Sequence, residues 1–233
     1  MVFVSLPTRR KQHLPWAAIL LASIATFAYL WMLHAGNDGA RQAELLRWGT
    51  LSASPGEWRQ LWHDGRLLTL VTALFIHANL LHLVGNGVFL LIFGVPAERR
   101  LGAVRLLVLF LLGGALANFV ASLVIGSSGR VIVGASGGIS ALVGAYLVLF
   151  PRAKLGIVVP LGLWLEFVRA PAALLIGLWA GLQLLFTFVG PAFGAVAWWA
   201  HLTGFVVGVV LALLFQPGLR AAARPSAPSS RRR

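Results

Sequence analysis

Residues 106–125 read LLVLFLLGGALANFVASLVI, and this stretch decides the fold class. It contains no charged side chain, and a helix that crosses the hydrocarbon core of a membrane requires roughly 20 mainly apolar residues. The whole chain agrees, because 59% of its 233 residues are hydrophobic and only 11% are charged. Soluble domains are typically about 25% charged. The sequence therefore predicts an all-α protein that lies in a membrane.

Five further apolar runs flank this stretch, separated from it by glycine, proline or charged residues, and each is close to the spanning length. The first run is longer than the roughly 7–15 residues of a signal-peptide core, so we expect an uncleaved helix there. The segment 156–165 is apolar but short and broken by proline, and we expect it at the interface. The predicted spans of this six-transmembrane-helix bundle are 16–33, 79–95, 106–125, 135–150, 170–189 and 194–215.

Composition also assigns the segments outside the spans. Residues 34–66 contain three tryptophans, a residue type that gathers in the headgroup region, so an external structured loop is expected there. Residues 1–15 are predicted to be a cytoplasmic segment that precedes a membrane domain of residues 16–215. Residues 216–233 are rich in proline, serine and arginine and are predicted to be a disordered basic cytoplasmic tail.

The charge is strongly positive, with 19 Lys and Arg against 6 Asp and Glu. In a soluble protein this excess would suggest nucleic acid as a partner. Here the basic residues cluster in short segments between apolar runs, where they set membrane orientation, so no nucleic-acid partner is expected. Most of them fall on the side that holds both termini, which are therefore predicted to be cytoplasmic. Short loops and an uncleaved first helix favour a bacterial inner membrane.

Few polar side chains remain at membrane depth, and each is a candidate for function. All six carboxylates fall in loops or at helix ends, which excludes an aspartyl dyad, a carboxylate proton relay and most metal sites. Cysteine is absent, which excludes a thiolate nucleophile. The polar residues left in or beside the spans are His77, His82, Asn86, Asn118, Ser136, Ser140, Gln183 and His201.

Ser136 lies in the sequence Gly134-Ala135-Ser136-Gly137-Gly138, where a predicted helix begins. Glycines on both sides let other backbone approach the hydroxyl, and the N–H groups of a helix N-terminus are able to hold an oxyanion. This combination resembles a nucleophile with part of its oxyanion hole. The alternative is a glycine-rich turn in which Ser136 only caps the helix.

His201 lies one to two turns into the last span, close to the depth expected of Ser136. Gly204 and Gly208 share its face and favour close contact with the span 135–150. Such a contact would place a hydroxyl beside an imidazole, the minimal arrangement for base-activated nucleophilic catalysis. With no acid as a third member, the pair would act as a dyad whose ring is oriented by packing. The alternative is an imidazole bonded to a backbone carbonyl or to loop water.

His82 and Asn86 are four residues apart and therefore share a helical face. Two neutral donors aimed at one point would stabilise an oxyanion, although interhelical hydrogen bonding is the alternative. His77 does not share that face, and a structural role in the incoming loop is favoured. We assign Asn118, Ser140 and Gln183 to helix packing.

With these motifs, and with Ala97-Glu98-Arg99-Arg100-Leu101-Gly102 after the second span, the chain resembles the rhomboid family from about residue 67 to 215. The resemblance implies a six-helix bundle with a wet cavity open to the outside, and cleavage of transmembrane segments of other proteins without metal or cofactor. It implies Ser136 as nucleophile and His201 as base and then acid. It further implies an oxyanion hole of His82, Asn86 and the Ser136 N–H. The fifth span would be the mobile side through which single-span substrates enter.

Two positions depart from the family pattern. Leu68 and Thr69 stand where many members carry Trp-Arg, and Ser140 stands where an aromatic residue often stacks on the histidine. An alternative function on the same fold is a proteolytically inactive membrane chaperone or binding protein, but such members usually lack the serine or the histidine. A transporter is disfavoured because no internal repeat or mid-membrane charge is present.

Overall fold

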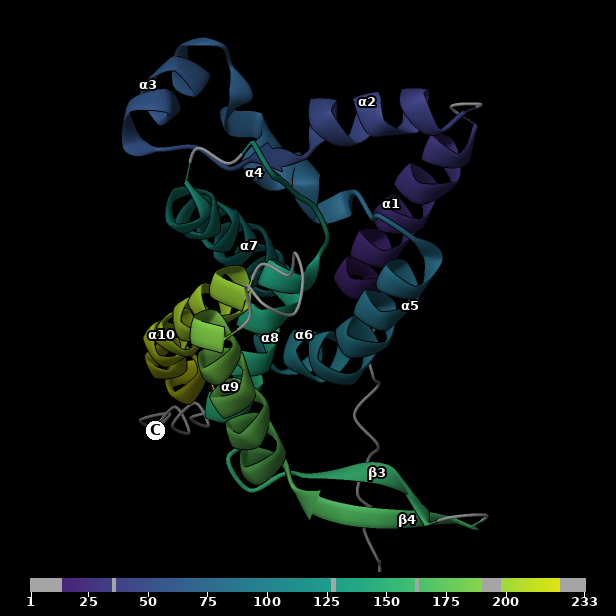
Figure 1. The fold of residues 1–233 in the computed structure, drawn as a ribbon. Helices are drawn as coiled ribbons and strands as arrows, with labels where there is room; N and C mark the ends of the chain where they lie inside the picture. The colour runs from purple at the N-terminus through teal and green to yellow at the C-terminus, as the bar shows by residue number, and fades with distance from the viewer. Residues whose placement is uncertain (1–13, 35–36, 127–128, 162–163, 190–197, 223–233) are drawn as a thin grey trace, which may run out of the picture.

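The computed structural model describes residues 14–34, 37–126, 129–161, 164–189 and 198–222, and Figure 1 shows a bundle of helices with small paired strands at its two ends. The helices are α1 (Trp16–Leu33), α2 (Asp38–Trp48), α3 (Pro55–His63), α4 (Thr69–Thr72), α5 (Leu80–Phe89), α6 (Val95–Leu101), α7 (Ala103–Ile125), α8 (Ser136–Leu149), α9 (Ala172–Val189) and α10 (Trp198–Ala222). Short 3₁₀ turns span Arg66–Leu68 and Ala73–Phe75, and a π-helical turn at Leu90–Gly94 joins α5 to α6. The strands are β1 (Thr50–Leu51), β2 (Val131–Ile132), β3 (Lys154–Leu161) and β4 (Trp164–Pro171).

The spanning helices confirm the prediction of an all-α membrane bundle. Five described helical segments are long and apolar enough to cross a membrane, namely Trp16–Leu33, Leu80–Leu101, Ala103–Ile125, Ala172–Val189 and Trp198–Gln216. The remaining predicted span, the fourth (135–150), corresponds to α8, which is shorter at 14 residues. Every residue of α8 from Gly137 to Tyr146 is buried. This helix is therefore the centre of the bundle and contacts protein on all sides.

The boundaries differ from the predicted ones mainly where glycine or proline intervenes. The second span extends to Leu101 and ends at Gly102, whose φ of +85° breaks the helix before α7. The fifth span begins at Ala172, because the preceding residues up to Pro171 belong to β4. The last helix begins at Trp198 and continues to Ala222. The predicted start of that span, the rest of the expected C-terminal tail and most of the N-terminal segment lie outside the described residues.

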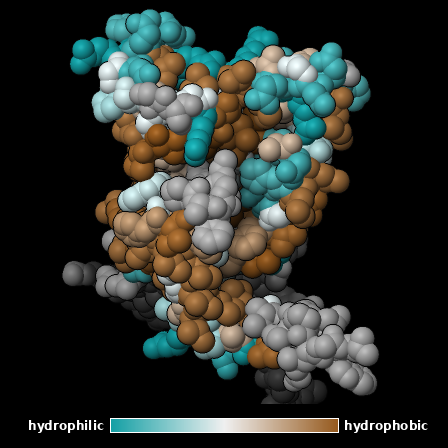
Figure 2. All heavy atoms as spheres, in the orientation of Figure 1, coloured by the Kyte–Doolittle hydropathy of each residue, from teal (hydrophilic) through white to brown (hydrophobic). Residues whose placement is uncertain are grey.

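The surface has the apolar character that a bilayer requires. In Figure 2 hydrophobic residues form a broad band across the visible face, whereas hydrophilic residues gather at the end that carries α2 and α3. Many large apolar side chains of the spans are exposed, including Phe27 in α1, Leu81 in α5 and Phe188 in α9. Contiguous apolar surface of this kind would not be stable in water. The chain is thus an integral, multi-pass membrane protein.

Glycines let α8 and α10 pack backbone to backbone. A Cβ atom added at Gly204 would overlap the carbonyl oxygen of Gly137, and one added at Gly208 would overlap that of Ala141. On α8 itself, a Cβ at Gly144 would overlap the carbonyl oxygen of Phe205. The predicted close contact between the spans that contain Ser136 and His201 is therefore present in the structure.

The segment between the first two spans is folded, as the sequence analysis expected of residues 34–66. Strand β1 pairs antiparallel with β2, so this segment is joined to the chain that leads into α8. Trp58 of α3 is buried, and its indole Nε1 donates to the Ser122 hydroxyl of α7 at 2.9 Å. The Arg66 guanidinium donates to the Leu46 carbonyl at 2.7 Å. These contacts anchor the segment although the Trp-Arg pair of many family members is absent.

Strands β3 and β4 were not foreseen. They form an antiparallel hairpin in which Lys154 is paired with Pro171, and it extends on both sides beyond the segment 156–165 that was expected only to lie at the interface. The run Ile157, Val158 and Val159 is β-branched, and such residues favour strands. This hairpin lies at the end of the bundle opposite α2 and α3 (Figure 1), away from the candidate site.

Candidate active site

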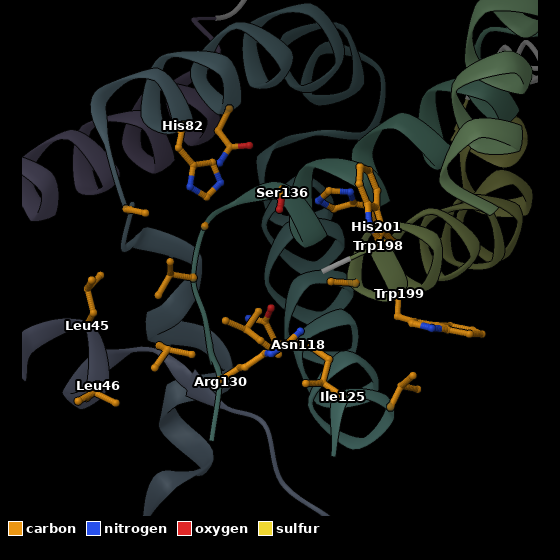
Figure 3. A pocket seen from close by; sticks show the side chains of 18 of the residues that line it. Leu45, Leu46, His82, Asn118, Ile125, Arg130, Ser136, Trp198, Trp199 and His201 are labelled. Atoms are coloured by element: carbon orange, nitrogen blue, oxygen red, sulfur yellow. The ribbon is translucent and has the colours of Figure 1, made fainter. Parts of the chain in front are cut away.

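A cavity of about 1110 Å³ opens among α2, α5, α7, α8 and α10. Most of its lining is apolar, and its polar lining side chains are Gln42, His82, Asn86, Asn118, Arg130, Ser136, Thr187 and His201. Figure 3 shows His82, Ser136 and His201 arranged around one space, although they come from three different helices. A smaller cavity of about 280 Å³ is also lined by His82, Asn86, Ser136 and His201, together with Gln183. The residues singled out from the sequence are therefore brought together.

The position of Ser136 follows from the turn that precedes α8. Gly134 has a φ of +114°, a conformation that side chains with a Cβ rarely adopt, and its N–H donates to the Ala73 carbonyl at 2.8 Å. Ser136 is the first residue of α8 and is half-buried at the cavity wall. The helix has its first backbone bond from Ile139 to Ala135, so the Ser136 N–H has no carbonyl partner within the helix. The hydroxyl and this N–H therefore belong to one residue at the cavity wall.

His201 faces Ser136 from α10, the helix that packs against α8. The contact of Gly204 with Gly137 places the first turns of α8 and α10 side by side, one turn beyond His201. Figure 3 shows the imidazole directed toward the serine side chain, and both residues line the two cavities. An imidazole beside a hydroxyl at a water-accessible cavity is the arrangement that base-activated nucleophiles use.

Two neighbours hold the His201 ring. Its Nδ1 lies 2.9 Å from Oε1 of Gln183, which belongs to α9. The indole of Trp198 contacts the ring edge-to-face with centroids 6.1 Å apart. This aromatic contact comes from α10 itself, whereas position 140 holds a serine whose hydroxyl donates to the Ser136 carbonyl at 2.7 Å. Gln183 and Trp198 thus orient the ring, and no aromatic residue at position 140 is needed for this.

Gln183 is the residue whose importance the sequence analysis missed. We assigned it to interhelical hydrogen bonding, and it does make such a bond, but the partner is His201. Gln183 is buried, and it lies 18 residues before the histidine in another helix. The available signal was an amide within an otherwise apolar span. Spacing in the sequence does not show which side chains of two different helices meet.

His82 and Asn86 line both cavities, as expected for residues on one face of α5. A Cβ added to Gly134 would lie 2.6 Å from His82 Nε2 and 3.5 Å from Asn86 Nδ2, so both side chains reach the turn before Ser136. The helix begins at Leu80 and is capped by Asn79, whose side-chain oxygen accepts from the His82 N–H at 2.8 Å. The side chains of His82 and Asn86 therefore lie close to the N-terminus of α8.

His77 supports this pair from outside the helix. It is fully buried, its Nδ1 lies 3.2 Å from the Phe75 carbonyl oxygen, and its Nε2 lies 3.0 Å from Asn86 Nδ2. A carbonyl oxygen only accepts, so Nδ1 carries the proton and Nε2 accepts from the amide. The second amide proton of Asn86 remains available. This geometry supports the structural role that we inferred for His77, and gives it a partner in the cavity.

We expect His77 to make the folded protein less stable in acid. Burial, followed by the nearby His82, lowers the pKa of His77 to about 4, against 6.5 for the free side chain. As the pH is lowered, His77 therefore takes up its proton at a higher pH in the unfolded chain than in the folded protein. The stabilisation from neutral His77 is complete above about pH 6.5 and is lost as the pH falls toward 4. The loss amounts to at most about 3 kcal/mol.

Thermal unfolding in detergent, measured from pH 7.5 to 4.5, checks this expectation. His77→Gln should flatten the acidic decline, whereas replacement of the exposed His63 by glutamine should leave the decline as in the wild type. A His77→Gln curve that falls as steeply as the wild-type curve would contradict the assignment.

Asn118 does not join the other donors directly. It lines the larger cavity, but its Nδ2 donates to the Leu70 carbonyl at 2.9 Å and so ties α7 to α4. This contact agrees with the packing role that we assigned to it.

These observations define a polytopic helical membrane protein with a serine and a histidine at a cavity between tightly packed helices. Comparison with known proteins identifies the family. The Rhomboid domain matches residues 60–218, which is more than half of the chain. The chain therefore belongs to the rhomboid family, as the motifs around Ser136, His201 and His82 indicated.

Several rhomboid proteins are similar to this chain. The rhomboid protease GlpG of Haemophilus influenzae is 29% identical over 151 residues, which cover 63% of this chain and 69% of GlpG. The putative rhomboid protease YdcA of Bacillus subtilis is 34% identical over 108 residues, or 46% of this chain and 49% of YdcA. The mitochondrial RHOMBOID-like protein 6 of Arabidopsis thaliana is 32% identical over 91 residues, or 39% of this chain. The chain spans 26% to 51% of the length of the three Arabidopsis relatives.

Proposed function

We propose that this protein is an intramembrane serine protease that hydrolyses peptide bonds in or near transmembrane segments of other membrane proteins. The observation that carries the proposal is the placement of Ser136 and His201 on two closely packed helices at one cavity. The similarity to proteins named as rhomboid proteases supports it. Both side chains that the reaction requires are present, which favours catalysis over a binding function on the same fold.

The reaction follows from the positions of the groups. His201 accepts the proton of the Ser136 hydroxyl as the oxygen attacks the scissile carbonyl carbon, and the carbonyl becomes an oxyanion. The Ser136 N–H, Asn86 Nδ2 and His82 donate to that oxyanion. His201 then gives its proton to the leaving amine, and water hydrolyses the acyl-enzyme through the same base. No step requires a metal or another cofactor.

The cavity also suggests how a substrate reaches the serine. It lies near the end of the bundle that carries α2 and α3, which we propose faces outside with both termini in the cytoplasm (Figure 1). The bacterial inner membrane is the proposed location. Only Ala172, Ile176 and Gln183 of α9 are buried among the described residues, so this helix is loosely held and forms the proposed entrance for single-span substrates.

Chemical labelling tests the proposed function directly. The purified protein in detergent is treated with a fluorophosphonate, and the modified residue is located by mass spectrometry. A reconstituted sample is given a single-span model substrate, and cleavage is followed in parallel. We expect modification of Ser136 together with cleavage. A protein that captures the substrate without labelling or cleavage would instead be an inactive rhomboid-like chaperone or binding protein.

Replacing Asn86 with alanine is expected to lower kcat by about 10²- to 10³-fold and to change KM little, because an oxyanion-hole donor acts mainly in the transition state. Cleavage kinetics in proteoliposomes measure the effect. Asn118→Ala is the matched control, since Asn118 bonds to a backbone carbonyl and its loss should reduce thermal stability without this loss of kcat. An Asn86→Ala enzyme with wild-type kcat would remove Asn86 from the oxyanion hole.

A further inference from the structure

The hydrogen bond between Gln183 and His201 has a direction that matters for catalysis. The two partners are His201 Nδ1 and Gln183 Oε1, at 2.9 Å. An amide oxygen is only an acceptor, so the imidazole Nδ1 carries the proton. In a neutral ring the other nitrogen, Nε2, then holds the lone pair. The bond therefore selects the tautomer in which Nε2 is the base.

Gln183 occupies the place that an acid takes in a Ser-His-Asp triad. The third member of such a triad fixes the tautomer and the orientation of the histidine, and an asparagine amide does so in some cysteine proteases. The cavity residues include no aspartate or glutamate in the described part of the chain. From the sequence, only packing was expected to orient the ring. The structure adds a buried amide with a defined hydrogen bond to Nδ1.

The surroundings show that Gln183 is placed for this contact. The buried residues Ala172, Ile176 and Gln183 form one stripe on α9, and Gln183 is the polar member. The hydroxyl of Thr187, which also lies on α9, donates within the helix to the Leu184 carbonyl. The other ring neighbour, Trp198, makes an edge-to-face contact and has no acceptor for Nδ1. Among the described residues, Gln183 thus makes the polar contact that holds the imidazole.

We infer that Gln183 is the positioning residue for His201, and that base activation of Ser136 requires α9 to be docked against α10. The inference rests on the proposed function, since a positioned base is meaningful only if His201 acts on Ser136. It extends the reaction from a dyad to a serine, a histidine and a glutamine from three separate helices. Withdrawal of α9 breaks the bond and leaves the tautomer unselected.

Two substitutions separate positioning from packing. Gln183→Leu keeps the bulk but removes the acceptor, and we expect kcat to fall about 5- to 150-fold at unchanged KM, the effect of an unpaired buried donor. Gln183→Glu keeps an oxygen acceptor and should retain kcat within about tenfold. The acidic limb of its pH–rate profile should also move to higher pH, because a carboxylate favours the charged imidazole. Of the other groups lining the smaller cavity only His82 titrates, and both variants retain it.

Gln216→Leu is the matched control, because it removes another interhelical glutamine bond, to the Val148 carbonyl on α8, at the far end of α10. It should leave kcat and the pH profile unchanged. A wild-type rate for Gln183→Leu would overturn the inference. Equal losses in Gln183→Leu and Gln183→Glu, with both proteins folded by thermal unfolding, would also overturn it and assign the residue to packing.

A spectroscopic measurement tests the hydrogen bond between Gln183 and His201 independently of proteolysis. In protein labelled with ¹⁵N-histidine, the His201 signals, assigned by their loss in His201→Gln, should show a protonated Nδ1 in the wild type and a mixture of tautomers in Gln183→Leu. An unprotonated Nδ1 in the wild type would overturn the inference even for an active enzyme. Absence of Ser136 labelling in the wild type, with Nδ1 protonated, would instead refute the proposed function.

Discussion

Replacing Ser136 with alanine is expected to lower kcat for cleavage of a reconstituted single-span substrate by about 10⁴-fold or more, the scale seen when a serine nucleophile is removed. Alanine retains the Cβ and the helical conformation, so α8 should still begin at this position. His201→Ala should cause a loss of similar size, because the hydroxyl is a weak nucleophile without a base. The double variant should be no slower than either single variant, since the two side chains act as a unit.

Ser140→Ala is the matched control for this prediction. Ser140 lies one turn along α8, and its hydroxyl donates to the Ser136 carbonyl rather than facing the reaction. Its removal should change kcat by only a few fold, on the order of one hydrogen bond. All variants are to be compared at equal folded concentration, as judged by thermal unfolding. Cleavage by folded Ser136→Ala at the wild-type rate would refute the mechanism.

Replacing Gly208 with leucine is expected to cause the largest loss of folding stability, about 3 kcal/mol or more. Even a Cβ at this position would overlap the Ala141 carbonyl oxygen and lie 2.6 Å from Ala141 Cα, and backbone atoms cannot turn aside as a flexible side chain does. Helices α8 and α10 would have to separate, which would draw His201 away from Ser136. The folding stability of the detergent-solubilised protein, measured by thermal unfolding, and its cleavage activity should therefore fall together.

The matched control is Gly181→Leu on α9. No atom lies within 4 Å of a Cβ built at Gly181, so the added side chain enters open space on an apolar surface. We expect a change of stability within about 0.5 kcal/mol, as for most surface substitutions. If Gly208→Leu proved as stable and as active as Gly181→Leu, the close contact of α8 and α10 would not be required for the site.

The candidate site residues could be inferred from the sequence because polar side chains are few within the membrane spans. A polar side chain in lipid is costly, so each one within a span is a candidate for function. The candidate site residues were therefore few, among them Ser136 and His201. The glycines at 204 and 208 predicted close helix packing for the same reason, since helices in lipid associate through small residues. The spacing of His82 and Asn86 placed both on one helical face. The Rhomboid match over residues 60–218 agrees with that inference.

Contacts between distant segments required the tertiary structure. No local rule pairs Gln183 with His201 or His77 with Asn86, since each bond joins segments whose relative placement depends on the whole bundle. The hairpin of β3 and β4 was missed because its short apolar run fits a strand as well as an interfacial segment.

The sequence by itself determined that this chain enters a membrane as helices, and which few polar side chains it carries there, because apolar length and the cost of burying polar groups are local properties. Only the tertiary structure decided which of those side chains meet. Hydrogen bonds between helices depend on the rotation, depth and crossing of each helix, and the packing of all the helices sets these together.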